Sequence, residues 1–328
     1  RSTLFPYTTL FRSLADVYLG SALTELLSRL DQADVSLPDR GPMDLGLAKL
    51  PSIIPYDSDR NRTAPVAFTG DKFEFRAPGA SQSIALPVTM FASLWAWGVQ
   101  QMTDMIEERS SGGKDPMDVA LDAVKEAVRR GGDVLFEGDA YSREWHEEAR
   151  KRGLIQAGDM PGKIDLLLLP ENKKMLEELG VFHEHELEAL HDIRMEAFVR
   201  SLEIEVAILY DMLWEGILPA LSKQLILEKN SLSALDGMEF PEGEPWREYI
   251  LGLGRTRAAL IEDAHRLNEL RGRMAELPVR ERADFLVGTA IPLMDSIRRR
   301  CDAAEVNMAA DIFCQRSEER RVGKECRS

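Results

Sequence analysis

The apolar and polar residues divide the chain into a short strand region and a much longer helical region. Apolar residues within 14–32 recur at helical spacing, which predicts an amphipathic first helix. Residues 33–64 are rich in proline and predict a loop. Apolar and polar residues then alternate through much of 66–76, which predicts strand structure with a hairpin-type turn at Gly70-Asp71.

The following segment carries no charged residue between Ala77 and Thr103. Its apolar part, residues 84–99, is shorter than the roughly 20 residues that a membrane span needs, and it contains Pro87. A helix buried on all sides is therefore favoured over a membrane span. Trp95 and Trp97 are expected in the core for the same reason.

The remaining chain predicts one helix after another, with charged faces opposite faces of Leu, Ile, Met and Ala. The longest predicted helix, 185–229, is expected to break or kink near residues 216–219, where a glycine and a proline lie close together. The fold class expected is α+β, mostly α, with a small sheet at about residues 50–80 and a bundle of long helices after it. The other predicted helices are 115–130, 141–152, 163–169, 171–179, 245–277 and 279–308.

The two ends of the chain look foreign to the rest. Residues 1–13 and 316–328 both begin and end in Arg-Ser. One DNA sequence encodes the first segment, its reverse complement encodes the second, and that DNA resembles a common sequencing adaptor. We therefore expect both segments to be adaptor-derived artefacts and the natural stretch to be 14–315.

Charge and cysteine content restrict the class of protein. The 328 residues contain 41 Lys and Arg against 56 Asp and Glu, a net charge of −15. This excess of acid argues against a partner made of nucleic acid and against an anionic membrane surface. None of the three cysteines lies in a CxxC pair, so no disulfide framework or zinc motif is expected. A reducing, cytoplasmic location fits this composition.

The strand region holds the residues best suited to chemistry. Because side chains alternate along a strand, Lys72, Glu74 and Arg76 share one face, and Phe73 and Phe75 point to the other face, toward the core. A carboxylate between two cations suits a site that binds a divalent metal and an anion together.

Arg62, brought close by the preceding strand, would add a second contact to phosphate. The alternative is an ordinary amphipathic strand whose charged face lies in water, and the alternation by itself favours that alternative.

Two other groups of residues have simpler explanations. His183, His185 and His191 have poor spacing for a zinc site on a helix and are expected at the surface. Trp145, close to His146, is expected to anchor packing, either in the core or at a subunit contact.

A resemblance to a known family alters the weight of these alternatives. Asn61-Arg62-Thr63-Ala64 followed by Lys72-Phe73-Glu74-Phe75-Arg76 resembles the glutamine synthetases, in which an Asn-Arg-Ser/Thr motif precedes an x-Glu-x-Arg strand. Longer strings are similar to the type III class in particular: DRNRTAPVAFTGDKFEFRAPGASQS at 59–83, YSREWHEEARKRGL at 141–154 and LEELGVFHEHELEAL at 176–190.

The resemblance implies roles for four residues. Glu74 would bind a divalent metal, Mg²⁺ or Mn²⁺, that holds the phosphates of ATP. Arg76 would bind the α-carboxylate of glutamate. Arg62 would contact the transferring γ-phosphate, and Lys72 stands where other classes carry an arginine near the nucleotide. A further arginine of those classes is replaced here by Ala67.

The implied activity is the ATP-dependent joining of glutamate and ammonia through γ-glutamyl phosphate, in a homo-oligomer of stacked rings. Residues 14–110 would be part of the catalytic domain and 111–315 the helical C-terminal region of the type III class. The remaining metal carboxylates would lie upstream, so the chain alone is expected to be inactive. The alternative is a non-catalytic helical scaffold or assembly module derived from such an enzyme.

Overall fold

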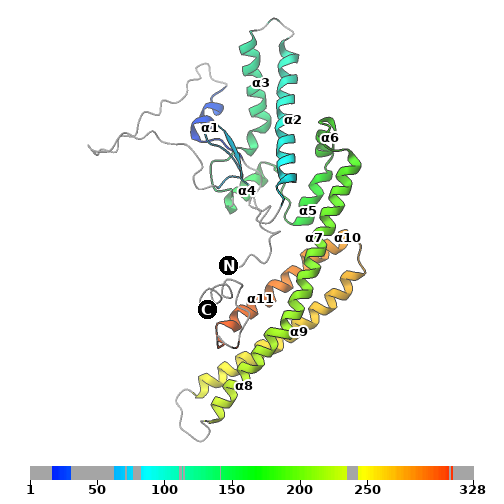
Figure 1. Cartoon of the computed structure of the whole chain (residues 1–328). Helices are drawn as coiled ribbons and strands as arrows, with labels where there is room; N and C mark the ends of the chain where they lie inside the picture. Colours follow the sequence, from blue (N-terminus) through cyan, green and yellow to red (C-terminus); the bar gives the residue numbers. More distant parts are fainter. Residues whose placement is uncertain are drawn as a thin grey trace, which may run out of the picture. The chain divides into compact units, whose positions relative to one another are not determined.

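The computed structural model describes residues 17–30, 63–70, 72–76, 83–110, 113, 115–140, 142–234, 243–309 and 312, and all structural statements concern these residues. They are mostly helical with one small sheet, which confirms the expected fold class (Figure 1). The chain divides into two compact units between Leu187 and Glu188, within one long helix. We call them the N-terminal and the C-terminal unit. The boundary expected near residue 110 separates the part that resembles a catalytic domain from the helical C-terminal region. It is not a boundary between compact units, and it stays a prediction.

The N-terminal unit contains the sheet and the shorter helices. In chain order its elements are β1 (Val17–Tyr18), α1 (Ser21–Ser28), β2 (Val66–Phe68), β3 (Phe73–Phe75), α2 (Ala85–Ser110), α3 (Pro116–Gly131), the 3₁₀ turn η1 (Gly132–Val134), α4 (Arg143–Lys151), α5 (Met160–Asp165), the 3₁₀ turn η2 (Leu166–Leu168) and α6 (Pro170–Glu178). The helix that crosses into the C-terminal unit is α7 (Glu184–Met212).

The sheet has the order β1-β2-β3. β1 is parallel to β2, and β2 is antiparallel to β3 with Phe68 opposite Phe73. Gly70 has a φ of 97°, a conformation that glycine adopts readily, which confirms that it lies in the predicted turn. Asp71 lies outside the described residues.

The prediction of a first helix beginning near residue 14 is wrong at its start. Val17 and Tyr18 form β1 and pair with β2, and the helix begins only at Ser21, after Gly20 at a φ of 84°. A β-branched and an aromatic residue suit a strand, and pairing with β2 supplies the backbone hydrogen bonds that periodicity alone cannot reveal.

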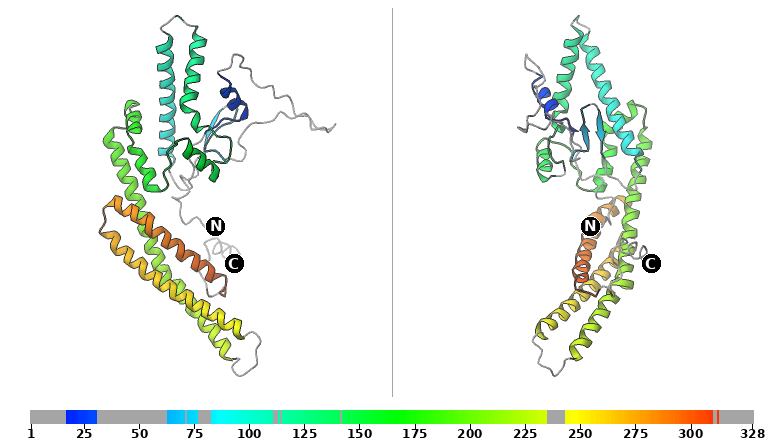
Figure 2. Two further views of the ribbon diagram at one scale, coloured as in Figure 1. Left: turned by 180° about the vertical axis from the view of Figure 1, so that it is seen from behind. Right: turned by 60° about the vertical axis from the view of Figure 1, so that its left-hand side comes forward.

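Helices α2 and α3 pack against each other as a hairpin (Figures 1 and 2). The prediction that the uncharged helix is buried on all sides is wrong for the described chain. Trp97 packs against a small core of Met175, Leu176 and Leu187, but Trp95 is 53% exposed. An apolar helix needs cover all round, and the described residues cover only part of α2.

Trp145 is the centre of a second small core in this unit. It is fully buried with Ala140 and Ala149, and its ring stacks on Phe136 at 4.3 Å between centroids. The expected packing anchor is therefore found inside the chain. Arg152 lies over the same ring and donates hydrogen bonds to carbonyl oxygens of the segment before α4.

Among its described residues, the regular secondary structure of the C-terminal unit is all helical. After α7 it continues with the π-helical segment η3 (Leu213–Ile217), α8 (Leu218–Ala234), α9 (Gly243–Ala275), α10 (Val279–Phe285), the π-helical segment η4 (Leu286–Ala290) and α11 (Ile291–Glu305). Helix α9 packs against both α8 and α11, which confirms the predicted bundle of long helices (Figure 1). Its core includes Val206, Leu213, Leu260, Leu267, Leu286 and Ile297.

Both π-helical segments end two residues before a proline, Pro219 in one case and Pro292 in the other. Proline has no backbone N–H and its ring collides with the carbonyl four residues earlier, so a locally wider turn relieves the helix. The predicted irregularity near 216–219 is confirmed, and the one at Leu286–Ala290 was not predicted. In the described part of the chain, no helix is both long and apolar enough to cross a membrane.

Candidate functional site

The candidate site lies on the hairpin formed by β2 and β3. The Thr69 backbone N–H donates to the Lys72 carbonyl at 2.8 Å, and the Arg76 N–H donates to the Pro65 carbonyl at 2.7 Å. The Thr69 hydroxyl also donates to the Lys72 carbonyl, at 3.2 Å. These bonds close both ends of the hairpin and fix the register of its charged side chains. The sequence pattern alone does not single out Thr69.

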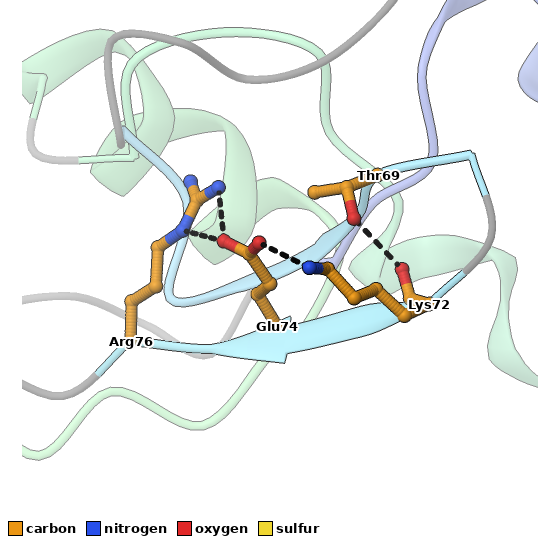
Figure 3. Close-up of polar contacts among 4 residues, drawn as sticks. All are labelled: Thr69, Lys72, Glu74 and Arg76. Carbon is orange, nitrogen blue, oxygen red and sulfur yellow. Dashed lines mark hydrogen bonds and ion pairs between the residues drawn. The ribbon is translucent and has the colours of Figure 1, made fainter.

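Lys72, Glu74 and Arg76 lie together on one face of this hairpin, as predicted from their alternation (Figure 3). The Glu74 Oε2 accepts hydrogen bonds from Nε and Nη2 of Arg76, at 3.2 and 3.0 Å. The Lys72 Nζ lies 3.6 Å from Glu74 Oε1. The carboxylate is thus held on both sides by cations from its own strand.

These three side chains differ in their exposure to solvent. The side chain of Arg76 is 18% exposed, whereas those of Glu74 and Lys72 are 39% and 64% exposed. The hydrogen bonds from Arg76, and then the charges of Arg76 and Lys72, hold the pKa of Glu74 below its usual value and outweigh partial desolvation. Glu74 is therefore a carboxylate at neutral pH, reachable from solvent.

The opposite face of the hairpin carries aromatic rings. Phe75 stacks on Phe91 of α2 at 5.0 Å between centroids, and Phe73 meets Trp95 edge to face at 5.3 Å. The two strand phenylalanines are nonetheless 38% and 39% exposed, so the expectation that they lie in the core is only half met. Helix α2 fixes the orientation of the strand by packing on this face.

Ala67 lies directly opposite Glu74 in the register of β2 and β3 and is fully buried. The Ala67 methyl group offers Glu74 neither a charge nor a hydrogen bond, and the cations that contact the carboxylate are Lys72 and Arg76 on either side of β3. Arg62, the remaining predicted site residue, lies outside the described residues, so its distance from Glu74 is untested. Thr63, the next residue, accepts a hydrogen bond from the Ala140 N–H at 3.2 Å.

A complete metal site is not present among the described residues. No group of three or more His, Cys, Asp or Glu side chains in that part of the chain could hold a metal ion. Glu74 is chemically suited to be one ligand of Mg²⁺ or Mn²⁺, but it is a single carboxylate flanked by cations. Further ligands would have to come from elsewhere.

His183 and His185 lie at the surface as expected, but the side chain of His191 is only 14% exposed. His183 and His185 are exposed, with their rings stacked 5.8 Å apart, and the His191 Nδ1 lies 3.0 Å from an Asp192 carboxylate oxygen. This neighbourhood belongs to the start of α7 and is separate along the chain from the hairpin.

Comparisons with known proteins agree on one family. A sequence model of the glutamine synthetase C-terminal domain matches residues 120–233. A type-3 glutamine synthetase from Dictyostelium discoideum is 28% identical over 89% of this chain and 41% of its own length. A glutamine synthetase from Bacteroides fragilis is 25% identical over 92% of this chain and 43% of its own length. The chain therefore spans about two-fifths of the length of these relatives.

Proposed function

Since the chain is related to the glutamine synthetases over about nine-tenths of its length, we propose that it is part of an ATP-dependent glutamate–ammonia ligase of the type III class. The observation that carries this proposal is the cluster of Lys72, Glu74 and Arg76 on one solvent-reachable face of β3. An ordinary amphipathic strand would account for a charged face in water. It would not account for the similarity of the surrounding sequence to glutamine synthetases.

In this proposal Arg76 binds the α-carboxylate of glutamate. Its Nε and Nη2 both donate to one oxygen of Glu74, Oε2, so the guanidinium is already directed at a carboxylate of the site. Because the arginine side chain is mostly buried, its direction is set before substrate arrives. Pre-set donors bind an anion with little loss of conformational freedom.

Glu74 supplies one ligand of a divalent metal, and Lys72 and Arg62 contact the phosphates of ATP. The metal would neutralise phosphate charge when bound. The chain's own contribution is positioning and charge neutralisation, on which phosphoryl transfer mainly depends. The glutamate γ-carboxylate attacks the γ-phosphate with release of ADP, and ammonia then displaces phosphate from the resulting γ-glutamyl phosphate.

The assembly belongs to the proposal as well. We infer a cytoplasmic enzyme whose full-length form is a homo-oligomer of stacked rings. Because the described residues supply only one carboxylate at the site, the chain alone should form no glutamine.

The test is formation of γ-glutamyl hydroxamate from glutamate, ATP and hydroxylamine, measured on the full-length protein and on this chain. Glu74→Gln should lower kcat by about 10²–10⁴-fold, the range found for lost electrostatic stabilisers. Arg76→Lys should mainly raise the KM for glutamate, because two-point binding of the carboxylate is lost. Glu147→Gln, at an exposed position of α4, is the matched control and should leave both constants unchanged.

Near-normal turnover of the Glu74→Gln enzyme would refute the site assignment. Hydroxamate formation by this chain alone would refute the need for further residues. A folded full-length protein without any ligase activity would favour the alternative, a helical scaffold derived from such an enzyme.

A further inference from the structure

The guanidinium of Arg152, at the C-terminal end of α4, is held from several sides. Its Nη1 donates hydrogen bonds to the carbonyl oxygens of Asp133 and Leu135, at 3.1 and 2.9 Å. Its Nε donates to Glu148 Oε1 at 2.9 Å, and its Cζ lies 5.3 Å from the centroid of the Trp145 ring. A guanidinium suits this junction because its rigid fork of donors can satisfy carbonyls while its plane stacks on an aromatic ring. The arginine therefore ties the segment before α4 to that helix.

This segment, residues 133–140, is itself packed into the small core around Trp145. The Phe136 ring stacks on the indole, and Ala140 is fully buried in the same cluster. Gly138 leaves the space that the stack needs, because a Cβ added there would lie 2.5 Å from Cζ of the Phe136 ring. Close packing of this kind gives the segment a fixed path between α3 and α4.

Two hydrogen bonds connect segment 133–140 with the sheet. The Phe136 N–H donates to the Val17 carbonyl of β1 at 3.2 Å. The Ala140 N–H donates to the Thr63 carbonyl, also at 3.2 Å. The first bond holds β1, which pairs with β2, and the second holds the residues that lead into β2. The segment therefore fixes the start of β2 from two directions.

The start of β2 in turn holds the backbone of Arg76. The Arg76 N–H donates to the carbonyl of Pro65, which stands two residues after Thr63. The Arg76 side chain is mostly buried, so the direction of its guanidinium follows the position of its backbone. A continuous series of contacts thus runs from Arg152, through segment 133–140 and the start of β2, to Arg76.

We propose that Arg152 is a positioning residue for Arg76, the binder of the glutamate α-carboxylate in the proposed function, on which this inference rests. Arg152 acts through the backbone rather than on the substrate, because it fixes segment 133–140 and thereby the strand start that holds Arg76. Misplacement of a binding group by about 1 Å can cost an enzyme up to about 10²-fold in rate. Arg152 lies within residues 120–233, so the region matched by the C-terminal domain model gains a part in substrate binding.

Amide hydrogen exchange of the full-length protein tests the positioning without any measurement of turnover. Arg152→Met keeps an unbranched side chain but removes every hydrogen-bond donor. The Ala140 and Arg76 amides should exchange about tenfold faster in this variant, because the acceptors of their N–H groups are no longer held in place. Arg143→Met is the matched control, since Arg143 also forms an i, i+4 ion pair on α4 but is highly exposed, and it should leave both amides unchanged.

The hydroxamate assay tests whether Arg152 acts through Arg76. Arg152→Met should raise the KM for glutamate by about tenfold and leave kcat and the KM for ATP within about twofold, the pattern of a weakened substrate contact. In the Arg76→Lys enzyme the same substitution should raise the KM for glutamate by less than about twofold, because the two residues act in series. General destabilisation of the fold would instead affect both enzymes alike.

Three outcomes would overturn the inference. One is unchanged exchange of the Ala140 and Arg76 amides in the Arg152→Met protein. Another is an equal rise of the KM for glutamate with and without Arg76→Lys. The third is a fall of kcat with an unchanged KM for glutamate. A full-length protein without ligase activity would refute the proposed function, and the exchange experiment would still decide whether Arg152 fixes the backbone of Arg76.

Discussion

Three carboxylates in this chain lie in very different electrostatic surroundings. Glu74 is bound by two cations of its own strand and stays open to solvent. Asp263 is almost fully buried, but Arg300 and Arg266 compensate its charge. Glu205 on α7 is different, because its Oε2 is buried and accepts no hydrogen bond within the described part of the chain. Burial without a partner raises the pKa of Glu205 to about 7.

Glu205 should make the stability of the protein depend on pH. Its folded pKa, about 7, lies above its ordinary value of 4.5, so the folded state holds the proton more tightly than the unfolded state. The contribution is fully present below about pH 4.5 and is lost as the pH rises toward 7. Glu205→Gln should therefore stabilise the protein more at pH 8 than at pH 5, by about 1 kcal/mol after allowance for solvent screening.

Urea unfolding of wild type and variant at both pH values measures this difference. Glu262→Gln, at an exposed position of α9, is the control and should show no pH-dependent gain. An equal effect of Glu205→Gln at pH 5 and pH 8 would contradict the assignment.

At the scale of elements, local rules explain where the helices begin and where they deform. Asp115 precedes α3, and its side chain accepts a hydrogen bond from the Met117 N–H at 2.8 Å, with Pro116 in the first turn. A proline also follows each π-helical segment by two residues, where its ring and its missing N–H deform the helix. Helix ends and irregularities are set by few residues, so single substitutions can test them.

Removal of the cap of α3 should destabilise the N-terminal unit. Asp115→Ala leaves the N–H groups of the first turn without their acceptor and should cost about 1 kcal/mol. Asp115→Asn keeps an oxygen acceptor in the same place and should cost much less. Denaturant unfolding, monitored by exchange of the α3 amides, measures the loss of stability in both variants. Equal stability of Asp115→Ala and Asp115→Asn would show that the Asp115 side chain does not cap α3.

At the scale of the whole molecule, the segment matched by the C-terminal domain model and the compact units do not coincide. The C-terminal domain match, 120–233, begins in α3 of the N-terminal unit and ends in α8 of the C-terminal unit. The sequence match therefore follows a continuous segment of chain, whereas the compact units are set by packing. The net charge of −15 is a property of the same scale, because it acts on partners regardless of fold.

This charge predicts that the chain does not bind polyanions. Phosphate or sulfate groups would be repelled over most of the surface, so we expect no retention on heparin and no shift of duplex DNA at physiological salt. A basic protein such as lysozyme serves as the positive control for the heparin column. Retention that falls with rising salt would show a local basic surface that overrides the net charge.

Much of the candidate site could be predicted from the sequence, because a strand places every second side chain on one face. That rule by itself brings Lys72, Glu74 and Arg76 together. It could not show that Arg76 is mostly buried, that Ala67 lies opposite Glu74, or that Thr69 closes the turn, since each depends on pairing with β2. The position of Arg62 and the proposed roles of all four residues stay predictions.

The sequence by itself determined the mostly helical class, the hairpin, most of the helices and the resemblance to the glutamine synthetases, because periodicity and motifs are local properties of the chain. Tertiary structure alone decided that Val17 and Tyr18 join a sheet, that Trp145 is core and that Trp95 is exposed. An apolar residue specifies only that burial is favourable. Whether a partner surface is present to bury it depends on segments far away in sequence, and for α2 the described chain supplies only part of that surface.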